Sequence, residues 1–159
     1  MNIFVTADTH FNHENIIKYC NRPFINSYDM NETIINNWNS VVSNDDIIYH
    51  LGDFGFGTKE ELYEIFNRLN GYKFLIMGNH DYRAGKRYYL DMGFIEVYKK
   101  LYELDNYIFT HKPMVVPENK INVYGHIHEK EVDPIFDDIN HLCVSLDRTD
   151  FKPLLLIKK

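Results

Sequence analysis

Short apolar runs that end directly in polar clusters recur five times along the chain. The runs are rich in β-branched and aromatic residues, a pattern typical of buried strands. The runs and the clusters that follow them lie at residues 3–5 and 8–10, 47–49 and 52–53, 74–76 and 78–81, 107–109 and 110–111, and 121–124 and 125–128. The pattern predicts five strands, each followed by a polar cluster where the strand ends.

Two segments between the first three runs have apolar residues at helical spacing. These positions are Ile34, Ile35, Trp38, Val41 and Val42 in the first segment and Leu62, Ile65, Phe66 and Leu69 in the second. Thr58 and Glu61 form a capping-box pattern just before the second segment. Alternating strands and helices favour parallel strands, whose carboxyl ends lie on one edge of a sheet. We therefore expect the polar clusters to converge.

The helical signal fades after about residue 94, and short strands dominate the rest of the chain. We expect strands at residues 94–98, 107–110, 121–124, 142–146 and 154–157, gathered in a second sheet. The sequence thus predicts an α/β protein with two face-to-face sheets and helices outside. Its length of 159 residues fits one domain over residues 1–159.

Composition and charge restrict the classes of function. No apolar run reaches the length of roughly 18 residues needed for a membrane span, and no signal-like segment begins the chain. The two cysteines, Cys20 and Cys143, form no CxxC pair. Lys and Arg number 17 against 23 Asp and Glu, for a net charge of -6, which disfavours extended nucleic-acid binding. We expect a cytoplasmic protein without a membrane partner.

Convergence of the clusters would gather seven potential metal ligands. They are two carboxylates, one amide and four imidazoles: Asp8, Asp53, Asn79, His10, His111, His126 and His128. Seven groups exceed what one ion ordinarily binds but suit two ions roughly 3.5–4 Å apart that share a carboxylate. We expect Asp53 to bridge them. Nitrogen and oxygen ligands without thiolate favour Mn, Fe, Zn, Co or Ni over Ca or Mg alone.

The same residues resemble the five signature motifs of the calcineurin-like metallophosphoesterases, in the family's order. The motifs read Asp8-x-His10, Gly52-Asp53, Gly78-Asn79-His80-Asp81, His111 and Gly125-His126-x-His128. The resemblance covers residues 8–128 and implies a four-layer αββα sandwich with two mixed sheets flanked by helices. It also implies a dinuclear centre, with manganese expected first, that hydrolyses phosphomonoesters or phosphodiesters.

The resemblance implies a role for each motif residue. One metal would be held by Asp8, His10, Asp53 and His128, and the other by Asp53, Asn79, His111 and His126. A hydroxide bridging the metals would attack the phosphorus, and His80 would contact the phosphate and assist the leaving group. Asp81 would orient His80 or its loop.

The second motif departs from the protein phosphatases of this superfamily. Those enzymes continue it as Gly-Asp-x-Val-Asp-Arg-Gly, whereas this chain has Phe54-Gly55-Phe56-Gly57 after Asp53. The departure argues against protein phosphatase activity and removes a phosphate-binding arginine. Arg22, Arg83 and His13 are our candidates for contacting the substrate phosphate; the alternatives are solvated arginines and a helix-start histidine.

We expect a small phosphorylated substrate, with nucleotides the favoured class. The competing hypothesis is a non-catalytic metal-binding scaffold of the same fold that binds other proteins. His50 and His141 are interpreted as structural or surface residues. The sequence leaves the exact substrate, the preference for monoesters or diesters and the oligomeric state open.

Overall fold

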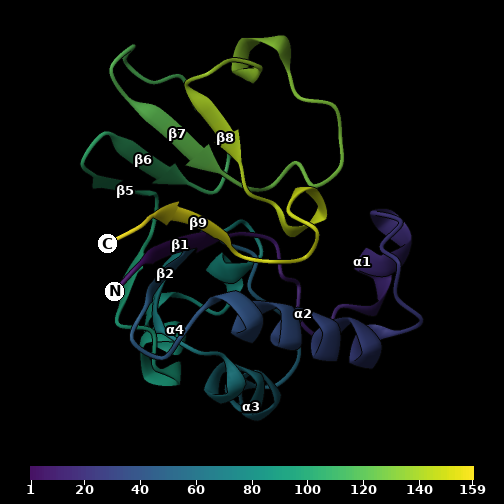
Figure 1. Cartoon of the computed structure of the whole chain (residues 1–159). Helices are drawn as coiled ribbons and strands as arrows, with labels where there is room; N and C mark the ends of the chain where they lie inside the picture. Colours follow the sequence, from purple (N-terminus) through teal and green to yellow (C-terminus); the bar gives the residue numbers. More distant parts are fainter.

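A computed structural model describes all of residues 1–159 and contains two stacked mixed β-sheets. The first sheet has the order β4-β3-β2-β1-β9, and the second has the order β5-β6-β7-β8. Figure 1 shows the second sheet above the first, with α-helices below the first sheet. The predicted mixed α/β class with two mixed sheets is confirmed.

Parallel pairing in the first sheet follows from the helices that connect its strands. Its members are β1 (Ile3–Thr6), β2 (Ile47–His50), β3 (Tyr72–Ile76), β4 (Glu96–Tyr98) and β9 (Leu154–Ile157). The first four strands run parallel, and β9 lies antiparallel to β1. The carboxyl ends of β1, β2 and β3 therefore share one edge, as predicted.

The second sheet is built from shorter connections. It contains β5 (Leu101–Leu104), β6 (Tyr107–Thr110), β7 (Ile121–Tyr124) and β8 (His141–Cys143). β5 and β6 form an antiparallel hairpin, whereas β6, β7 and β8 are parallel. The prediction that residues 94–98 and 154–157 join this sheet is wrong. Both segments pair in the first sheet, because β4 completes the βα alternation and β9 pairs with the free edge of β1.

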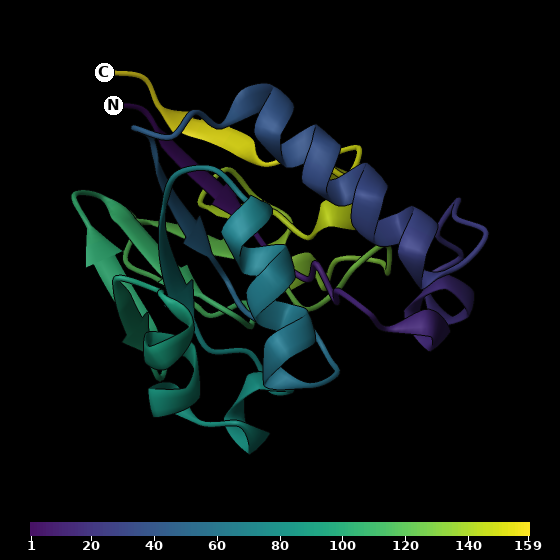
Figure 2. The same cartoon turned by 90° about the horizontal axis from the view of Figure 1, so that it is seen from below.

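All four α-helices precede the second sheet in the chain. They are α1 (Glu14–Tyr19), α2 (Ser27–Val41), α3 (Lys59–Arg68) and α4 (Lys86–Met92). Figure 2 shows α2 and α3 lying across the first sheet. α3 begins with the predicted capping box of Thr58 and Glu61. The connection between β7 and β8 contains only the short 3-10 helix Pro134–Phe136, so the second sheet carries no α-helix of its own. None of the helices is long and apolar enough to cross a membrane.

The core has two layers, set by the two faces of the first sheet. One layer packs the helices against the first sheet and includes Met30, Trp38 and Phe54. The other lies between the sheets and includes Val5 and Phe109. Alternate residues of β1 enter the two layers, as the two-residue period of a strand requires. Helices and sheets thus hold the strand ends in fixed relative positions.

Candidate metal centre

All five polar clusters meet at the carboxyl ends of the strands. Asp8 and His10 follow β1, Asp53 follows β2, and Asn79 and His80 follow β3; His111 follows β6, and His126 and His128 follow β7. The loops after β1 and β2 are joined by backbone hydrogen bonds: the N–H of Asp8 donates to the carbonyl of Gly52 at 3.0 Å, and that of His10 to the carbonyl of Asp53 at 3.1 Å. This contact fixes the first two clusters against each other.

Asp8, His10 and His128 form one group of potential ligands, with donor atoms within 4.8 Å of one another. Oδ2 of Asp8 accepts hydrogen bonds from the N–H of His126 at 2.8 Å and from the Ser145 hydroxyl at 2.6 Å. Oδ1 of Asp8 and both ring nitrogens of His10 are buried and have no hydrogen-bond partner. Buried polar atoms are rarely left unpaired, so these atoms fit a role as metal ligands.

Asp53, His111 and His126 form a second group within the same distance range. Nε2 of His111 lies 2.9 Å from Oδ1 of Asn79 and 3.2 Å from Nδ1 of His126. Nδ1 of His111 lies 2.8 Å from the carbonyl of Leu51, which orients the ring. The second group therefore offers a carboxylate, an amide oxygen and two imidazoles.

Asp53 lies between the two groups. Its Oδ2 is 3.6 Å from Nε2 of His10 and 3.4 Å from Nε2 of His111. Its Oδ1 accepts a hydrogen bond from the N–H of His80 at 3.0 Å. Burial acts to raise the pKa of Asp53, but the hydrogen bond and charge of His111, with the charge of His10, hold that pKa well below its usual value. The carboxylate is therefore ionised and positioned to serve both groups.

The candidate ligands have an unusual backbone conformation. Asp8, His10, Asp53, His126 and His128 all have φ between 48° and 72°. Residues other than glycine seldom adopt this left-handed backbone conformation, and those that do are often found at functional sites. Five of the seven candidate ligands share it, which indicates that the loops are shaped to aim these side chains.

Two motif glycines permit the close approach of the loops. A Cβ on Gly78 would lie 2.2 Å from Oδ1 of Asp53, and a Cβ on Gly125 would lie 2.7 Å from Oδ2 of Asp8. Any larger side chain would displace the carboxylates. The motif glycines are therefore required by packing against Asp8 and Asp53.

The two imidazoles of the second group have opposite pKa shifts. Burial, followed by the positive charges of His111 and Lys112, lowers the pKa of His126 to about 4. Burial alone would lower the pKa of His111, but the hydrogen bond to Asp53 and the carboxylates of Asp8 and Asp53 raise it. His126 is therefore neutral near pH 7 and available as a ligand.

His80, His13 and Arg83 lie at the rim of this centre. The His80 side chain is 46% exposed, and its Nε2 lies 3.9 Å from Oδ2 of Asp53. The His13 ring centroid is 5.5 Å from that of His10, and Arg83 lines a hollow of about 440 Å³ together with His80. All three are therefore close to the cluster, and Arg83 forms no ion pair.

Arg22 is not placed to contact a phosphate. Its guanidinium is buried and donates to both carboxylate oxygens of Asp147, at 2.9 and 3.0 Å, and to the carbonyls of Thr9 and Asp8, at 3.1 and 2.7 Å. It also contacts the Met30 sulfur at 3.5 Å. These contacts use all five N–H donors of the group. The hypothesis that Arg22 binds the substrate phosphate therefore finds no geometric support.

Asp147, which sequence reasoning missed, joins Arg22 to a candidate ligand. Its Oδ2 lies 2.8 Å from Nδ1 of His128. Burial opposes charge on both partners, but the hydrogen bonds to Asp147 and Cys20 and the charges of Asp8 and Asp147 raise the pKa of His128 to about 10. The contacts with His128 and Arg22 lower the pKa of Asp147 to about 2. Nε2 of His128 is left facing Asp8, 4.0 Å from Oδ1. No motif contains Asp147, and only the fold shows its position.

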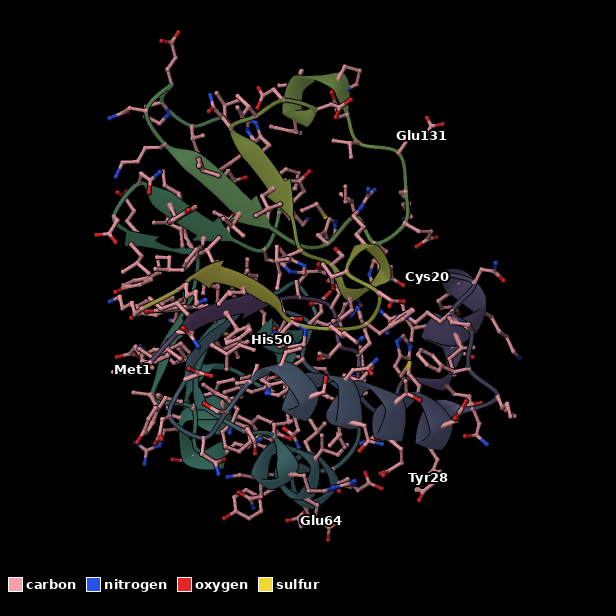
Figure 3. The ribbon with its side chains drawn as sticks, in the orientation of Figure 1. Met1, Cys20, Tyr28, His50, Glu64 and Glu131 are labelled. Atoms are coloured by element: carbon pink, nitrogen blue, oxygen red, sulfur yellow. The ribbon has the colours of Figure 1, made fainter.

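Asp81, in the third motif, and His50, close to the second, form hydrogen bonds with other parts of the protein. Asp81 is buried and accepts hydrogen bonds from the N–H groups of Gly78 and Asp53, both at 2.7 Å, so it orients the loops and not His80. His50, the last residue of β2, lies inside the molecule (Figure 3), with Nε2 2.9 Å from Oγ1 of Thr9. Both arrangements favour the structural interpretations of these residues.

The donor set fits divalent transition metals. It combines carboxylates with imidazoles and an amide oxygen in two groups, the first of which contains buried donor atoms without protein partners. Such a set is typical of Mn, Fe, Zn, Co or Ni sites. A third group of potential ligands consists of Cys20, His128, Glu129 and Asp147. It shares His128 with the first group, and Nδ1 of His128 already contacts Asp147.

Comparison with known proteins agrees with this geometry. The family model described as calcineurin-like phosphoesterase matches residues 1–159. An uncharacterised protein of Methanocaldococcus jannaschii is 36% identical, over 97% of this chain and 86% of that protein. The crystal structure of a protein of unknown function from Aquifex aeolicus has a TM-score of 0.78 and 28% identity, covering 96% of this chain and 94% of that one.

A second solved structure is that of an archaeal phosphodiesterase. Its TM-score is 0.48 at 17% identity, covering 99% of this chain and 100% of that chain, which is too distant to support an inference. The family model alone decides the class, because it spans the whole chain. The chain belongs to the calcineurin-like phosphoesterases, a family of metal-dependent enzymes, and the expected membership is confirmed.

Proposed function

We propose that the chain, as one domain over residues 1–159, hydrolyses a small phosphodiester or phosphomonoester of nucleotide type at a centre for two divalent transition metals, with manganese the first candidate. One observation carries the proposal: two groups of donor atoms adjoin Asp53, whose Oδ2 lies 3.6 Å from His10 and 3.4 Å from His111, and the first group includes buried atoms with no protein partner. Asp8, His10, Asp53 and His128 would hold one cation. Asp53, Asn79, His111 and His126 would hold the other.

When bound, two such cations supply an activated water and neutralise the phosphoryl oxygens. The residues of the chain would fix the geometry of the reaction. Asp53 would set the spacing of the two cations, and the hydrogen bonds to Asp8 and His111 would hold those ligands in place. Pre-positioning of this kind lowers the reorganisation needed at the moment of reaction.

His80 is the proposed proton donor to the leaving group. Its main chain is fixed to Asp53 by a 3.0 Å hydrogen bond, while its ring stays half exposed. The ring can therefore reach a substrate in the cleft without having to serve as a ligand. Arg83 and His13, on the rim, remain the candidates for contacting the substrate phosphate.

Hydrolysis of bis(p-nitrophenyl) phosphate with added Mn²⁺ tests the proposal. We expect turnover that chelator abolishes and Mn²⁺ restores, and that Asp53→Asn reduces by at least 10²-fold, as loss of a shared metal ligand should. The control is Asp138→Asn, a change on the surface remote from the cluster. Tight Mn²⁺ binding without turnover of any phosphoester would instead support the non-catalytic scaffold.

A further inference from the structure

A hollow of about 450 Å³ opens beside the second group of candidate ligands. Its walls come from the loops after β3 and β6 and from the connection between β4 and β5. The lining residues include Asn79, His111 and three lysines, Lys99, Lys100 and Lys112. Because Asn79 and His111 belong to the candidate metal centre, a ligand in this hollow would adjoin the reacting phosphate.

The charge of the hollow is opposite to that of the molecule. Its lining contains three lysines and no carboxylate, although the chain as a whole has a net charge of -6. None of Lys99, Lys100 and Lys112 forms an ion pair, whereas Lys86 and Lys120 lie 2.8 and 3.4 Å from Glu96 and Glu103. Three lysines without ion pairs at one hollow give it a local positive charge, which favours an anion.

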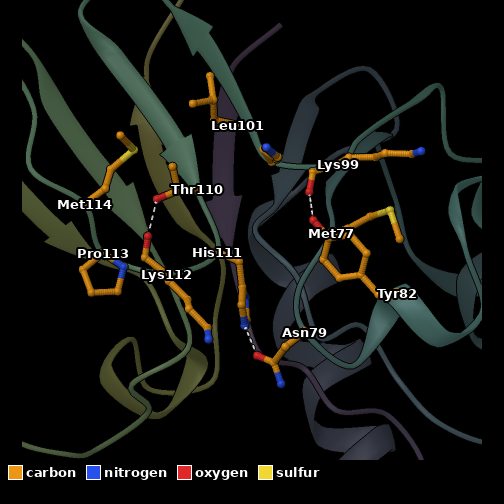
Figure 4. Close-up of a pocket in the computed structure, with 11 residues that line it drawn as sticks. Met77, Asn79, Tyr82, Lys99, Leu101, Thr110, His111, Lys112, Pro113 and Met114 are labelled. Atoms are coloured by element: carbon orange, nitrogen blue, oxygen red, sulfur yellow. Dashed lines mark hydrogen bonds between the residues drawn. The ribbon is translucent and has the colours of Figure 1, made fainter.

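Lys112 is held next to the metal centre by its loop. The hydroxyl of Thr110 donates to the carbonyl of Lys112 at 2.7 Å. The buried amide of Asn122 donates to the hydroxyl of Thr110 at 2.8 Å and accepts from the N–H of Met114 at 3.0 Å. Figure 4 shows Lys112 and His111 extending from this loop toward Asn79. The loop thus fixes the main chain from which the Lys112 side chain extends toward Asn79.

The remaining walls of the hollow are apolar. Met114 and Pro113 lie on one side, and Tyr82 and Met77 lie on the other (Figure 4). The phenol hydroxyl of Tyr82 donates to the carbonyl of Lys99, which fixes the ring at the rim. Small-molecule sites commonly combine apolar walls with a few placed charges. The hollow therefore suits a compact organic group that carries an anion.

We propose that this hollow binds a second phosphate of the substrate, together with the organic group that joins it to the scissile phosphate. The substrate class is then a small phosphoester with at least two phosphates. This inference rests on the proposed function and adds specificity to it. Lys112 would contact the substrate next to the candidate metal centre, and Lys99 and Lys100 would add positive charge at the opposite wall.

Two chromogenic esters that differ by one phosphate test the inference. They are thymidine 5′-(p-nitrophenyl phosphate) and the same compound with a 3′-phosphate, both of which release p-nitrophenolate. We expect the wild-type KM to be at least 10-fold lower for the compound with the 3′-phosphate. Lys112→Gln and the double variant Lys99→Gln/Lys100→Gln should bring the ratio of the two KM values close to one.

Lys120→Gln provides the matched control, because Lys120 pairs with Glu103 outside the hollow and its loss should preserve the ratio. Calorimetry with chelator present adds a readout without turnover: thymidine 3′,5′-bisphosphate should bind the wild type at least 10-fold more tightly than thymidine 5′-monophosphate, and Lys112→Gln should remove this preference. A wild-type KM ratio near one, or a ratio that persists in both lysine variants, overturns the inference. Failure of chelator-sensitive hydrolysis of bis(p-nitrophenyl) phosphate counts separately, against the proposed function.

Discussion

Nδ1 of His128 lies 2.8 Å from Oδ2 of Asp147, and the same carboxylate receives two hydrogen bonds from Arg22. The ring of His128 is thereby fixed at one nitrogen, while its Nε2 faces Oδ1 of Asp8. A carboxylate behind a metal-binding imidazole orients the ring and increases its basicity. Arg22 and Asp147 therefore influence the candidate centre by orienting the ring of His128.

Replacement of Asp147 should weaken metal binding. We expect Asp147→Asn to reduce Mn²⁺ affinity by about 10- to 100-fold, the usual effect of losing such a carboxylate. Competition with a metal-sensitive dye measures this change directly. Asp138→Asn is the matched control, because Asp138 contacts His141 at 2.7 Å in a similar pair on the surface.

Folding of the Asp147 variant needs its own control. The change leaves the buried Arg22 without a charged partner, which can cost about 3–5 kcal/mol. The double variant Arg22→Gln/Asp147→Asn avoids an isolated buried charge and should show the same loss of affinity. Wild-type Mn²⁺ affinity in a folded variant of either kind would contradict the role of Asp147.

His80→Ala should separate metal binding from turnover. We expect unchanged Mn²⁺ stoichiometry and a loss of about 10²- to 10⁴-fold in kcat, the range associated with general acid catalysis. The loss should be larger for alkyl than for p-nitrophenyl leaving groups, because a good leaving group needs little protonation. Full activity of the variant with an alkyl phosphoester would refute the assignment of His80.

Two of the four helices and all strands except β5 could be predicted because local patterns encode them, whereas the short helices α1 and α4 were not predicted. The capping box at Thr58 and the apolar spacing of Leu62 and Ile65 act within one helix, and the structure contains that helix. Assignment of strands to sheets depends on long-range pairing, which local pattern does not specify. Residues 154–157 were therefore predicted as a strand correctly but placed in the wrong sheet.

The sequence allowed prediction only of those site residues that belong to the motifs. Asp8, Asp53 and their partners could be proposed because each follows a strand, and parallel strands bring their ends together. Asp147 and Asn122 lie outside the motifs and act through contacts made only after folding. Arg22 was misjudged for the same reason: its closeness to the first motif was apparent, but its pairing with Asp147 was not.

Asp81 should contribute to stability through the loops it joins. One of its oxygens accepts from the N–H groups of Asp53 and Gly78, and the other accepts from the Tyr89 hydroxyl at 2.9 Å. Asp81→Asn would turn an amide N–H₂ toward some of these donors, so we expect a loss of about 3 kcal/mol in unfolding free energy, against about 1 for Tyr89→Phe. Denaturant unfolding of metal-free protein measures both. Asp45→Asn, at an exposed position, is the control, and equal stability of all three variants would contradict the prediction.

His50 should make stability depend on pH in the acid range. Burial lowers its pKa to about 3, while Nδ1 accepts from the N–H of Gly52 at 3.2 Å and Nε2 contacts Thr9. Only the neutral ring fits this environment, so the unfolded chain, with an ordinary pKa near 6.5, binds the proton first as the pH falls. Stability is therefore lost between about pH 6.5 and 3. A single proton adds up to about 1.4 kcal/mol per pH unit to the slope. Denaturant unfolding with chelator present should show a smaller slope in His50→Gln than in wild type, and identical slopes would show that His50 does not titrate on unfolding.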